Sequence, residues 1–160
     1  MKIRFATDDI FDVPFPSLVG AKLDGLNLHR AILEGEKMEN SSLINCNLRG
    51  AFLSRANLDH SNLYQANLIT AFLTDAILTS CNFRECIAYN CNFVNADLRE
   101  SNFEKANIRY ADFSGCFLQG CILKCDGIDL AVFHGAVYDD RTVWPIHFNP
   151  EKAGCVKENQ

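Results

Sequence analysis

The residues best suited to chemistry in this chain of 160 are its eight cysteines and four histidines. A thiolate can act as a nucleophile, and thiolates together with imidazoles form zinc sites. Cys81, Cys86 and Cys91 follow one another at intervals of five residues. Whether such residues meet in one site depends on where the chain places their side chains, so the surrounding sequence pattern decides the question.

That pattern is a five-residue repeat. In the stretch LSRANLDHSNLYQANLIT, residues 53–70, a large apolar residue recurs every five positions. We call each five-residue unit a phrase and its large apolar residue the centre. The phase holds without insertion or deletion through 24 centres from Leu23 to Tyr138, and only Ala88 among them is not large and apolar. Ala, Ser or Cys stands two residues before 21 of these centres. Two inward positions separated by one residue have the period of an extended strand, so the remaining residues must turn the chain.

Right-angle corners would close the path after four phrases, and turns of 20 residues would then stack through parallel β-type hydrogen bonds. We number the four walls from the centres Leu23, Leu28, Leu33 and Met38. Six turns over residues 21–140 would form a solenoid about 29 Å long with a filled core. The pattern resembles the pentapeptide-repeat family, whose consensus is close to Ala-(Asp/Asn)-Leu-X-X. The resemblance implies an all-β solenoid, a right-handed four-sided parallel β-helix with short terminal caps.

The two ends depart from the repeat. We expect residues 1–20 to form an N-terminal cap and an incomplete first turn. Residues 141–160 are expected to form a C-terminal cap in which Trp144 and Phe148 cover the last layer. Within it, Asn149 to Gly154 read as one helical turn with an N-cap and a glycine stop. This tail resembles those of pentapeptide-repeat proteins common in oxygenic photosynthetic bacteria.

The register of the repeat also predicts where the cysteine side chains point. Six of them occupy the small inward position: Cys46, Cys81, Cys86, Cys91, Cys116 and Cys121. Cysteine in such a position behaves as a small buried hydrophobe. Cys81, Cys86 and Cys91 fall on three successive walls, which does not favour a tetrahedral metal site. Cys125 is expected to face outward and Cys155 lies in the tail, so these two are the thiols predicted to react.

Enzymatic chemistry is not indicated. The chain has no Gly-rich phosphate loop, no HExxH motif and no nucleophile elbow, and no two of its histidines stack. A filled core leaves no cleft for a small-molecule substrate, and we predict no catalytic residue, cofactor or metal. With a pI of about 5.3 and no basic stripe, direct nucleic-acid binding is not expected. The sequence also shows no apolar run for a membrane span or a signal peptide, which favours a cytoplasmic protein.

Surface charge offers a first candidate site. The fourth wall carries a net charge of −5 over residues 21–140. Its acidic face consists of seven residues, set against two bases: Glu36, Glu39, Asp59, Asp97, Glu100, Asp139 and Asp140. Such a face is typical of a solvated surface. The family resemblance implies a second interpretation, because some members bind DNA gyrase by presenting an acidic rod of duplex-like width. A DNA-mimicking regulator of a topoisomerase is therefore the alternative function, although these acids are sparser than duplex phosphates.

The residue immediately before each centre, which we call the outward slot, is expected to point to solvent. These slots offer a second candidate site. Eleven slots hold Asn or Asp, which favour turns and bond nearby backbone, and nine hold an apolar residue. Three of the apolar slots stack on wall three, and we call Ile32, Phe52 and Phe72 the stripe. A contiguous apolar stripe indicates a contact site for a protein, or for a second copy of this chain across a two-fold axis. Alternatively, the two phenylalanines only pack on each other. We predict a non-enzymatic binding or scaffold module that acts through protein–protein contacts on its walls, with an unidentified partner.

Overall fold

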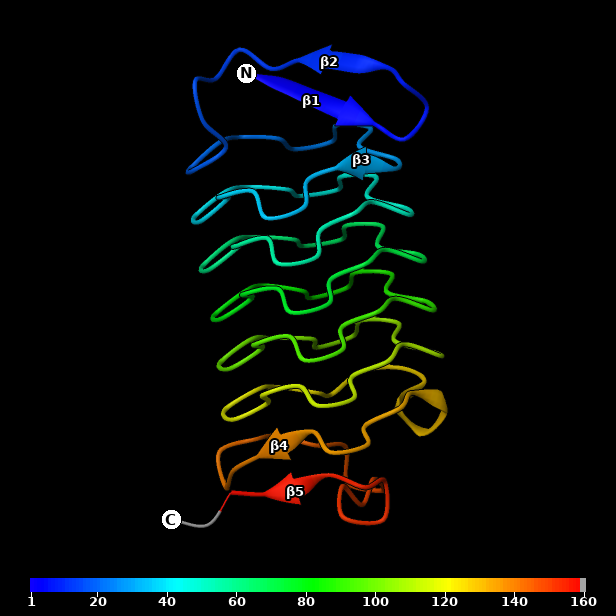
Figure 1. Cartoon of the computed structure of the whole chain (residues 1–160). Helices are drawn as coiled ribbons and strands as arrows, with labels where there is room; N and C mark the ends of the chain where they lie inside the picture. Colours follow the sequence, from blue (N-terminus) through cyan, green and yellow to red (C-terminus); the bar gives the residue numbers. More distant parts are fainter. Residues whose placement is uncertain (159–160) are drawn as a thin grey trace.

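The computed structural model describes residues 1–158 as a stack of square rungs, with a hairpin at one end and the folded tail at the other (Figure 1). Few stretches are long enough to count as strands, because each side of a rung is only a few residues long. The named elements are β1 (Lys2–Phe5), β2 (Ile10–Asp12), β3 (Ala31–Ile32), the 3-10 helix η1 (Ile128–Leu130), β4 (Val137–Tyr138) and β5 (Val156–Lys157).

Parallel bridges hold the rungs together. Each outward slot pairs with the slot 20 residues further on, from Lys22 with Ser42 to Asn102 with Ile122, in four rows that follow the four walls. The bonding alternates as in a parallel sheet. The Leu23 N–H donates to the Ser42 carbonyl at 2.7 Å, and the Ser42 N–H donates to the Ala21 carbonyl at 2.9 Å. The predicted stacking of 20-residue turns is therefore confirmed over this range.

The corners from residue 20 to residue 120 use a residue with left-handed backbone geometry. The N–H of the small inward residue usually bonds the carbonyl of the centre three positions earlier, as Ala31 does to Leu28 at 3.0 Å, whereas the Cys81 N–H donates to Oγ of Ser101 at 3.0 Å. The residue before the small one has φ between 52° and 69° at 21 successive corners from Gly20 to Gly120. Such turns need positive φ at their third residue. Fifteen of these residues are not glycine, and the hydrogen bonds of the stacked layers hold them in that conformation.

The Asn and Asp slots stabilise these corners directly. In all eleven, the side-chain Oδ1 accepts the backbone N–H two residues further on, for example Asn62 from Tyr64 at 3.1 Å. Some side chains also bond between layers, since the Asn82 amide donates to Asn62 at 2.9 Å. The prediction that these residues bond nearby backbone is confirmed.

Phenylalanines fill the lower half of the core in two ladders. On wall one, Phe83 stacks on Phe103 with ring centroids 4.5 Å apart. On wall three, Phe113 lies between Phe93 and Phe133 at 4.8 Å and 5.1 Å. The two ladders meet edge to face across the core, at 5.7 to 6.0 Å. Bulky centres of walls one and three thus face one another across the core, and Ala88 lies fully buried on the wall between them.

We expect Ala88→Leu to destabilise the protein by about 1–3 kcal/mol, because a larger side chain must enter a layer that is already filled. Thermal or denaturant unfolding measures the change. The volume-conserving Ile108→Leu, one layer below on the same wall, is the control and should cost less than about 1.5 kcal/mol. Unchanged or increased stability of Ala88→Leu would mean that a void exists beside Ala88.

The repeat is less regular at its lower end than the sequence predicts. Bridges there step by 19 residues from Asn107 to Asp126 and by 21 from Ile122 to Val143. The prediction of an uninterrupted phase is wrong in this last turn, although the centre Ile128 stays buried. The cause is local: Gly127 has φ 77° and precedes η1. A Cβ there would lie 2.1 Å from Cγ of Arg109, so the shortened turn favours glycine.

Different structures cover the two ends. At the top, β1 pairs antiparallel with both β2 and β3, in the order β2-β1-β3, and buries Ile3. At the bottom, Trp144 and Phe148 contact the Phe133 ring at centroid distances of 5.7 and 5.5 Å. β5 then pairs in parallel with β4 and so adds a further side to the stack.

The expected helical turn in the tail is only partly formed. The Asn149 side chain accepts the Lys152 N–H at 2.9 Å, as an N-cap would, but residues 149–154 form a hydrogen-bonded turn and not a helix. Gly154, with φ 86°, reverses the chain after one turn and directs it into β5.

Candidate interaction surface

The thiols are shielded from solvent. All eight cysteines are free, and five donate their S–H to a backbone carbonyl, for example Cys81 to Leu58 at 3.0 Å. Burial raises the pKa of Cys81 to about 12 and that of Cys46 to about 11. No group of three or more His, Cys, Asp or Glu side chains suited to a metal ion occurs among residues 1–158.

The prediction that Cys125 and Cys155 are the reactive thiols is contradicted. Cys155 is only 8% exposed, because β5 joins the stack and carries this residue under the last layer. Cys125 is half-buried and donates to the Leu123 carbonyl at 3.1 Å. Burial raises the pKa of Cys125 to about 12 and that of Cys155 to about 11, so neither forms appreciable thiolate at neutral pH.

We therefore expect no rapidly reacting thiol in the native protein at neutral pH. Titration with Ellman's reagent should show only slow labelling, because the attacking thiolate is scarce and buried. The same sample in denaturant should titrate close to the eight cysteines of the sequence. Fast labelling of one full equivalent in the native state would show that the tail leaves the stack.

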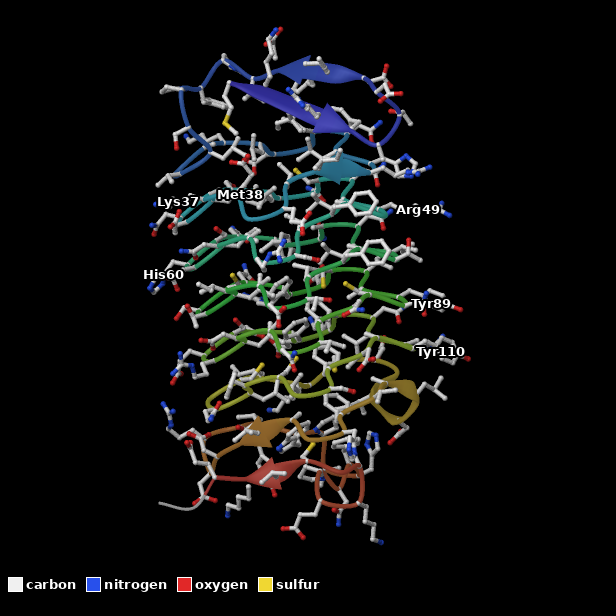
Figure 2. The ribbon with its side chains drawn as sticks, in the orientation of Figure 1. Lys37, Met38, Arg49, His60, Tyr89 and Tyr110 are labelled. Carbon is white, nitrogen blue, oxygen red and sulfur yellow. The ribbon has the colours of Figure 1, made fainter. Side chains whose placement is uncertain are left out.

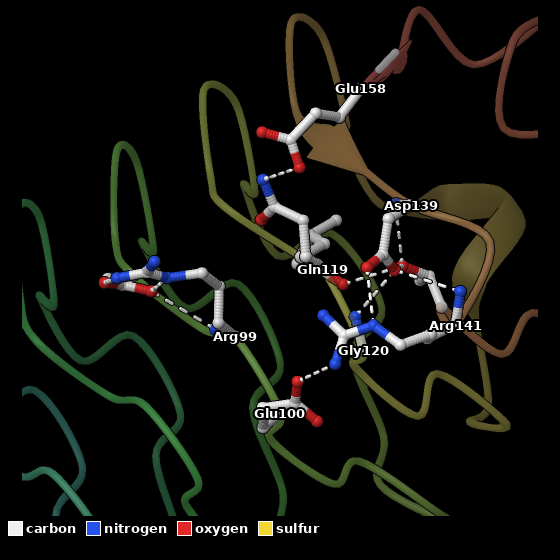
Figure 3. Close-up of polar contacts among 10 residues, drawn as sticks. Arg99, Glu100, Gln119, Gly120, Asp139, Arg141 and Glu158 are labelled. Carbon is white, nitrogen blue, oxygen red and sulfur yellow. Dashed lines mark hydrogen bonds and ion pairs between the residues drawn. The ribbon is translucent and has the colours of Figure 1, made fainter. Parts of the chain in front are cut away.

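The lower half of the acidic face is neutralised by bases that the tail brings to it (Figure 3). Arg141 pairs with Glu100 and with Asp139, the latter at 2.8 Å, and Lys157 pairs with Asp140 at 2.6 Å. Arg99 pairs with Asp97 at 2.5 Å within the same wall. Only the upper acids, Glu36, Glu39 and Asp59, have no Lys or Arg partner in residues 1–158.

Asp139 anchors this network. Burial opposes its ionisation, but bonds from the Gly120 N–H, Arg141 and Thr142 outweigh that effect and lower the pKa of the carboxyl. The Gly120 N–H donates to it at 2.9 Å. Because the folded pKa lies below the ordinary value of 3.8, the network stabilises the fold fully above that pH and loses the contribution as pH falls further.

The stripe lies on wall three. Ile32, Phe52 and Phe72 form consecutive bridges, and the rings of Phe52 and Phe72 stack with centroids 5.3 Å apart and planes 8° apart. Ile32 is 44% exposed and Phe72 41%, while Phe52 is half-buried between them. Above the stripe, Arg4 of β1 pairs with Ile32 and separates it from the exposed Ile10 of β2.

A second apolar row was not predicted from the sequence. Phe117 pairs with Val137, which pairs with Val156, so these three stack on wall four at the lower end. Steps of 20 residues would place Lys157 beneath Val137, and the 19-residue step into β5 replaces it with Val156. The alternation of Val156 with the buried Cys155 is the sequence signal that could have indicated it.

The corner between walls two and three carries bases and aromatic rings. Arg49, Tyr89 and Tyr110 lie above one another along this edge of the stack, and Lys37 and His60 lie at the opposite edge (Figure 2). The Tyr89 and Tyr110 rings meet edge to face at 5.4 Å, and the two side chains are 42% and 51% exposed. We call Arg30, Arg49, Tyr89, Arg109 and Tyr110 the arginine–tyrosine edge.

No deep cleft accompanies these features in the described part of the chain. A shallow recess joins the edge to the stripe, lined by His29, Arg30, Arg49, Gly50, Phe52, Thr70 and Phe72. No helix within residues 1–158 is long and apolar enough to cross a bilayer.

A closed stack of bridged rungs around a core of filled centres defines a repeat solenoid, which presents its walls and not a cavity. A family model described as "Pentapeptide repeats (8 copies)" matches residues 37–75, 76–115 and 89–124, which together cover more than half of the chain. The chain belongs to the pentapeptide-repeat family, whose members form right-handed quadrilateral β-helices and are generally non-enzymatic scaffolds.

Solved structures agree with this assignment. The chain is similar to the pentapeptide repeat protein Rfr23 from the cyanobacterium Cyanothece 51142, with TM-score 0.55 and 26% identity over 79% of this chain and 90% of that one. HetL from the cyanobacterium Nostoc sp. strain PCC 7120, involved in heterocyst differentiation regulation, aligns with TM-score 0.51 and 25% identity over 78% of this chain but only 58% of its own.

QnrB1, a plasmid-mediated fluoroquinolone resistance protein, aligns with TM-score 0.50 and 20% identity over 87% of this chain and 92% of its own, and shows the fold alone. No curated protein matches the chain.

Proposed function

We propose that this chain is a non-enzymatic binding module that acts through protein–protein contacts on the walls of its solenoid, with the stripe as the principal contact. The observation that carries the proposal is an aromatic and aliphatic row left open to solvent on wall three, outside a core whose centres are buried. Interface cores favour aromatic residues, and flat solenoid walls serve as extended binding surfaces.

The stacking of Phe52 on Phe72 bears on both interpretations of the stripe. A stacked pair contributes about 0.5–1.5 kcal/mol beyond its buried area, so local packing is part of its role. Stacking does not remove the pair from solvent, however, because the outer face of Phe72 remains open and Ile32 continues the row above it. A partner or a second copy of this chain would cover that remaining apolar surface.

The test is the double variant Phe52→Asn with Phe72→Asn, which installs the residue that nine of the 24 slots already hold. We expect the melting temperature to fall by only a few degrees, while self-association or capture of a protein from a native extract is lost. The matched control is Ile77→Asn with Ile87→Asn, in the same slot and similarly exposed on other walls. The control should retain all binding. Analytical ultracentrifugation and quantitative affinity capture provide the measurements.

Two results would argue against the stripe as a contact. One is a much lower melting temperature of the double variant with every partner retained. The other is equal loss of a partner in the Ile77 and Ile87 control, which would indicate nonspecific binding to apolar slots.

The alternative of a DNA mimic acting on a topoisomerase gains no support from the charges. A mimic needs a continuous acidic surface, whereas Arg99, Arg141 and Lys157 neutralise the lower half of the acidic face. A gyrase supercoiling assay is the direct check, and we expect no inhibition.

A further inference from the structure

The arginines of this chain divide into two groups of four. Arg55, Arg84, Arg99 and Arg141 each pair with a carboxylate. Arg4, Arg30, Arg49 and Arg109 make no ion pair and no side-chain hydrogen bond within residues 1–158. The second group gathers on one side of the stack, with three at the arginine–tyrosine edge and Arg4 beside the stripe.

Within the repeat layers this edge also lacks acids, although Asp8 and Asp9 of the loop between β1 and β2 lie beside Arg4 and His29. The ten corner residues between walls two and three, at positions 29–30, 49–50, 69–70, 89–90 and 109–110, include no Asp or Glu. The other three corners of the same layers all carry acids, for example Asp24, Glu34 and Glu39. Although the protein has a net charge of −5, the three arginines of this corner, with no acid among the ten corner residues, create a local positive potential.

The arginines and the stripe belong to one continuous surface. Arg30 and Arg49 line the shallow recess together with Phe52 and Phe72. Gly50 also lines this recess, and a Cβ at that position would make ordinary contact with Cγ of Arg30, at 3.4 Å. Below the recess, Tyr89 and Tyr110 continue the edge with two exposed rings.

We infer that the arginine–tyrosine edge, together with the stripe, binds an extended acidic segment of a partner protein that also carries apolar side chains. Its carboxylates pair with Arg30 and Arg49, its apolar side chains lie on Phe52 and Phe72, and its distal part contacts Tyr89 and Tyr110. From Arg30 to Tyr110 the edge rises four layers, about 19 Å, which matches roughly six residues of extended chain. The inference rests on the proposed function and names the chemistry of the partner.

Charge density favours a protein segment over a nucleic acid. Each strand of duplex DNA presents a phosphate about every 3.4 Å of helix axis, whereas this edge offers three guanidiniums over about 19 Å, on a chain that repels polyanions overall. A peptide with two or three carboxylates fits that spacing. Arginine also favours carboxylates geometrically, because its planar fork bonds both oxygens.

Fluorescence anisotropy with synthetic peptides tests the inference. The probe is a fluorescein-labelled ten-residue peptide that alternates glutamate with phenylalanine and leucine, and the comparison peptide has lysine in place of each glutamate. We expect the acidic peptide to bind at least about tenfold more tightly, with affinity falling as salt screens the pairs. Double charge reversal, Arg30→Glu with Arg49→Glu, should reverse this preference. Lys105→Glu, with the same position in the repeat as Arg30 and the same positive φ, should change nothing.

The outcomes separate the two proposals. If both peptides bind equally, or if the charge reversal leaves the preference unchanged, the inferred partner chemistry is wrong. If the stripe variant still loses its contacts in that case, the proposed function stands without it. Tighter binding of a labelled oligothymidylate than of the acidic peptide would overturn the inference in favour of single-stranded nucleic acid.

Discussion

Replacing Phe113 with alanine is expected to destabilise the protein by about 3–5 kcal/mol, because it removes the most extensively stacked ring of the core. Phe113 is fully buried, stacks on Phe93 and Phe133, and meets Phe103 edge to face. Its removal therefore opens a cavity that touches three layers. The layers cannot close over it, because the backbone bonds fix their spacing. For a protein of this size the melting temperature should fall by roughly 6–20 °C.

Phe113→Leu is the control for Phe113→Ala. Leucine already occupies the wall-three centre in upper layers, at Leu53 and Leu73, so this variant should lose much less stability. If the alanine variant unfolded at the same denaturant concentration as the wild type, the phenylalanine ladder would not be the continuous core that the ring distances indicate.

Replacing Trp144 with alanine is expected to cost about 3 kcal/mol and to promote aggregation. Trp144 contacts the rings of Phe133, Tyr138 and Phe148 at centroid distances between 5.1 and 5.7 Å, so it covers the last layer. Without it, the tail is expected to detach and to expose the edge of β4, which can template pairing with another chain. Unfolding curves and light scattering after mild heating measure the two effects.

Trp144→Phe separates packing from polarity. The indole Nε1 is buried without a hydrogen-bond partner among residues 1–158, so phenylalanine removes an unsatisfied donor while it keeps an aromatic ring on Phe133. This variant should stay close to wild-type stability and remain monodisperse. A loss as large as that of the alanine variant would mean that the indole N–H, and not the ring, holds the cap.

Residue patterns within single phrases were sufficient to predict the solenoid. The small residue and the centre lie two positions apart, and in an extended chain residues two apart point to the same face. Because this spacing recurs in every phrase, both residues face the core along the whole repeat. The inward set and the backbone-bonding role of the Asn and Asp slots followed from that fact. The left-handed corners were harder to predict from the sequence. Glycine at 25 and 35 and asparagine at 40 and 45 indicate positive φ, but Thr70 and Tyr110 adopt it too, although neither residue type favours it.

The sequence by itself thus determined the length of a turn and the residues that face the core, because those depend on period and side-chain size within a few residues. Only the tertiary structure decided which charges are neutralised, which thiols are covered and which arginines stay free. Arg141 reaches Glu100 across 41 positions of the chain, and β5 buries Cys155 after a 19-residue step. Such contacts arise from the return of the tail to the stack, where one residue more or less in the last turn changes every neighbour, and no local pattern encodes that offset.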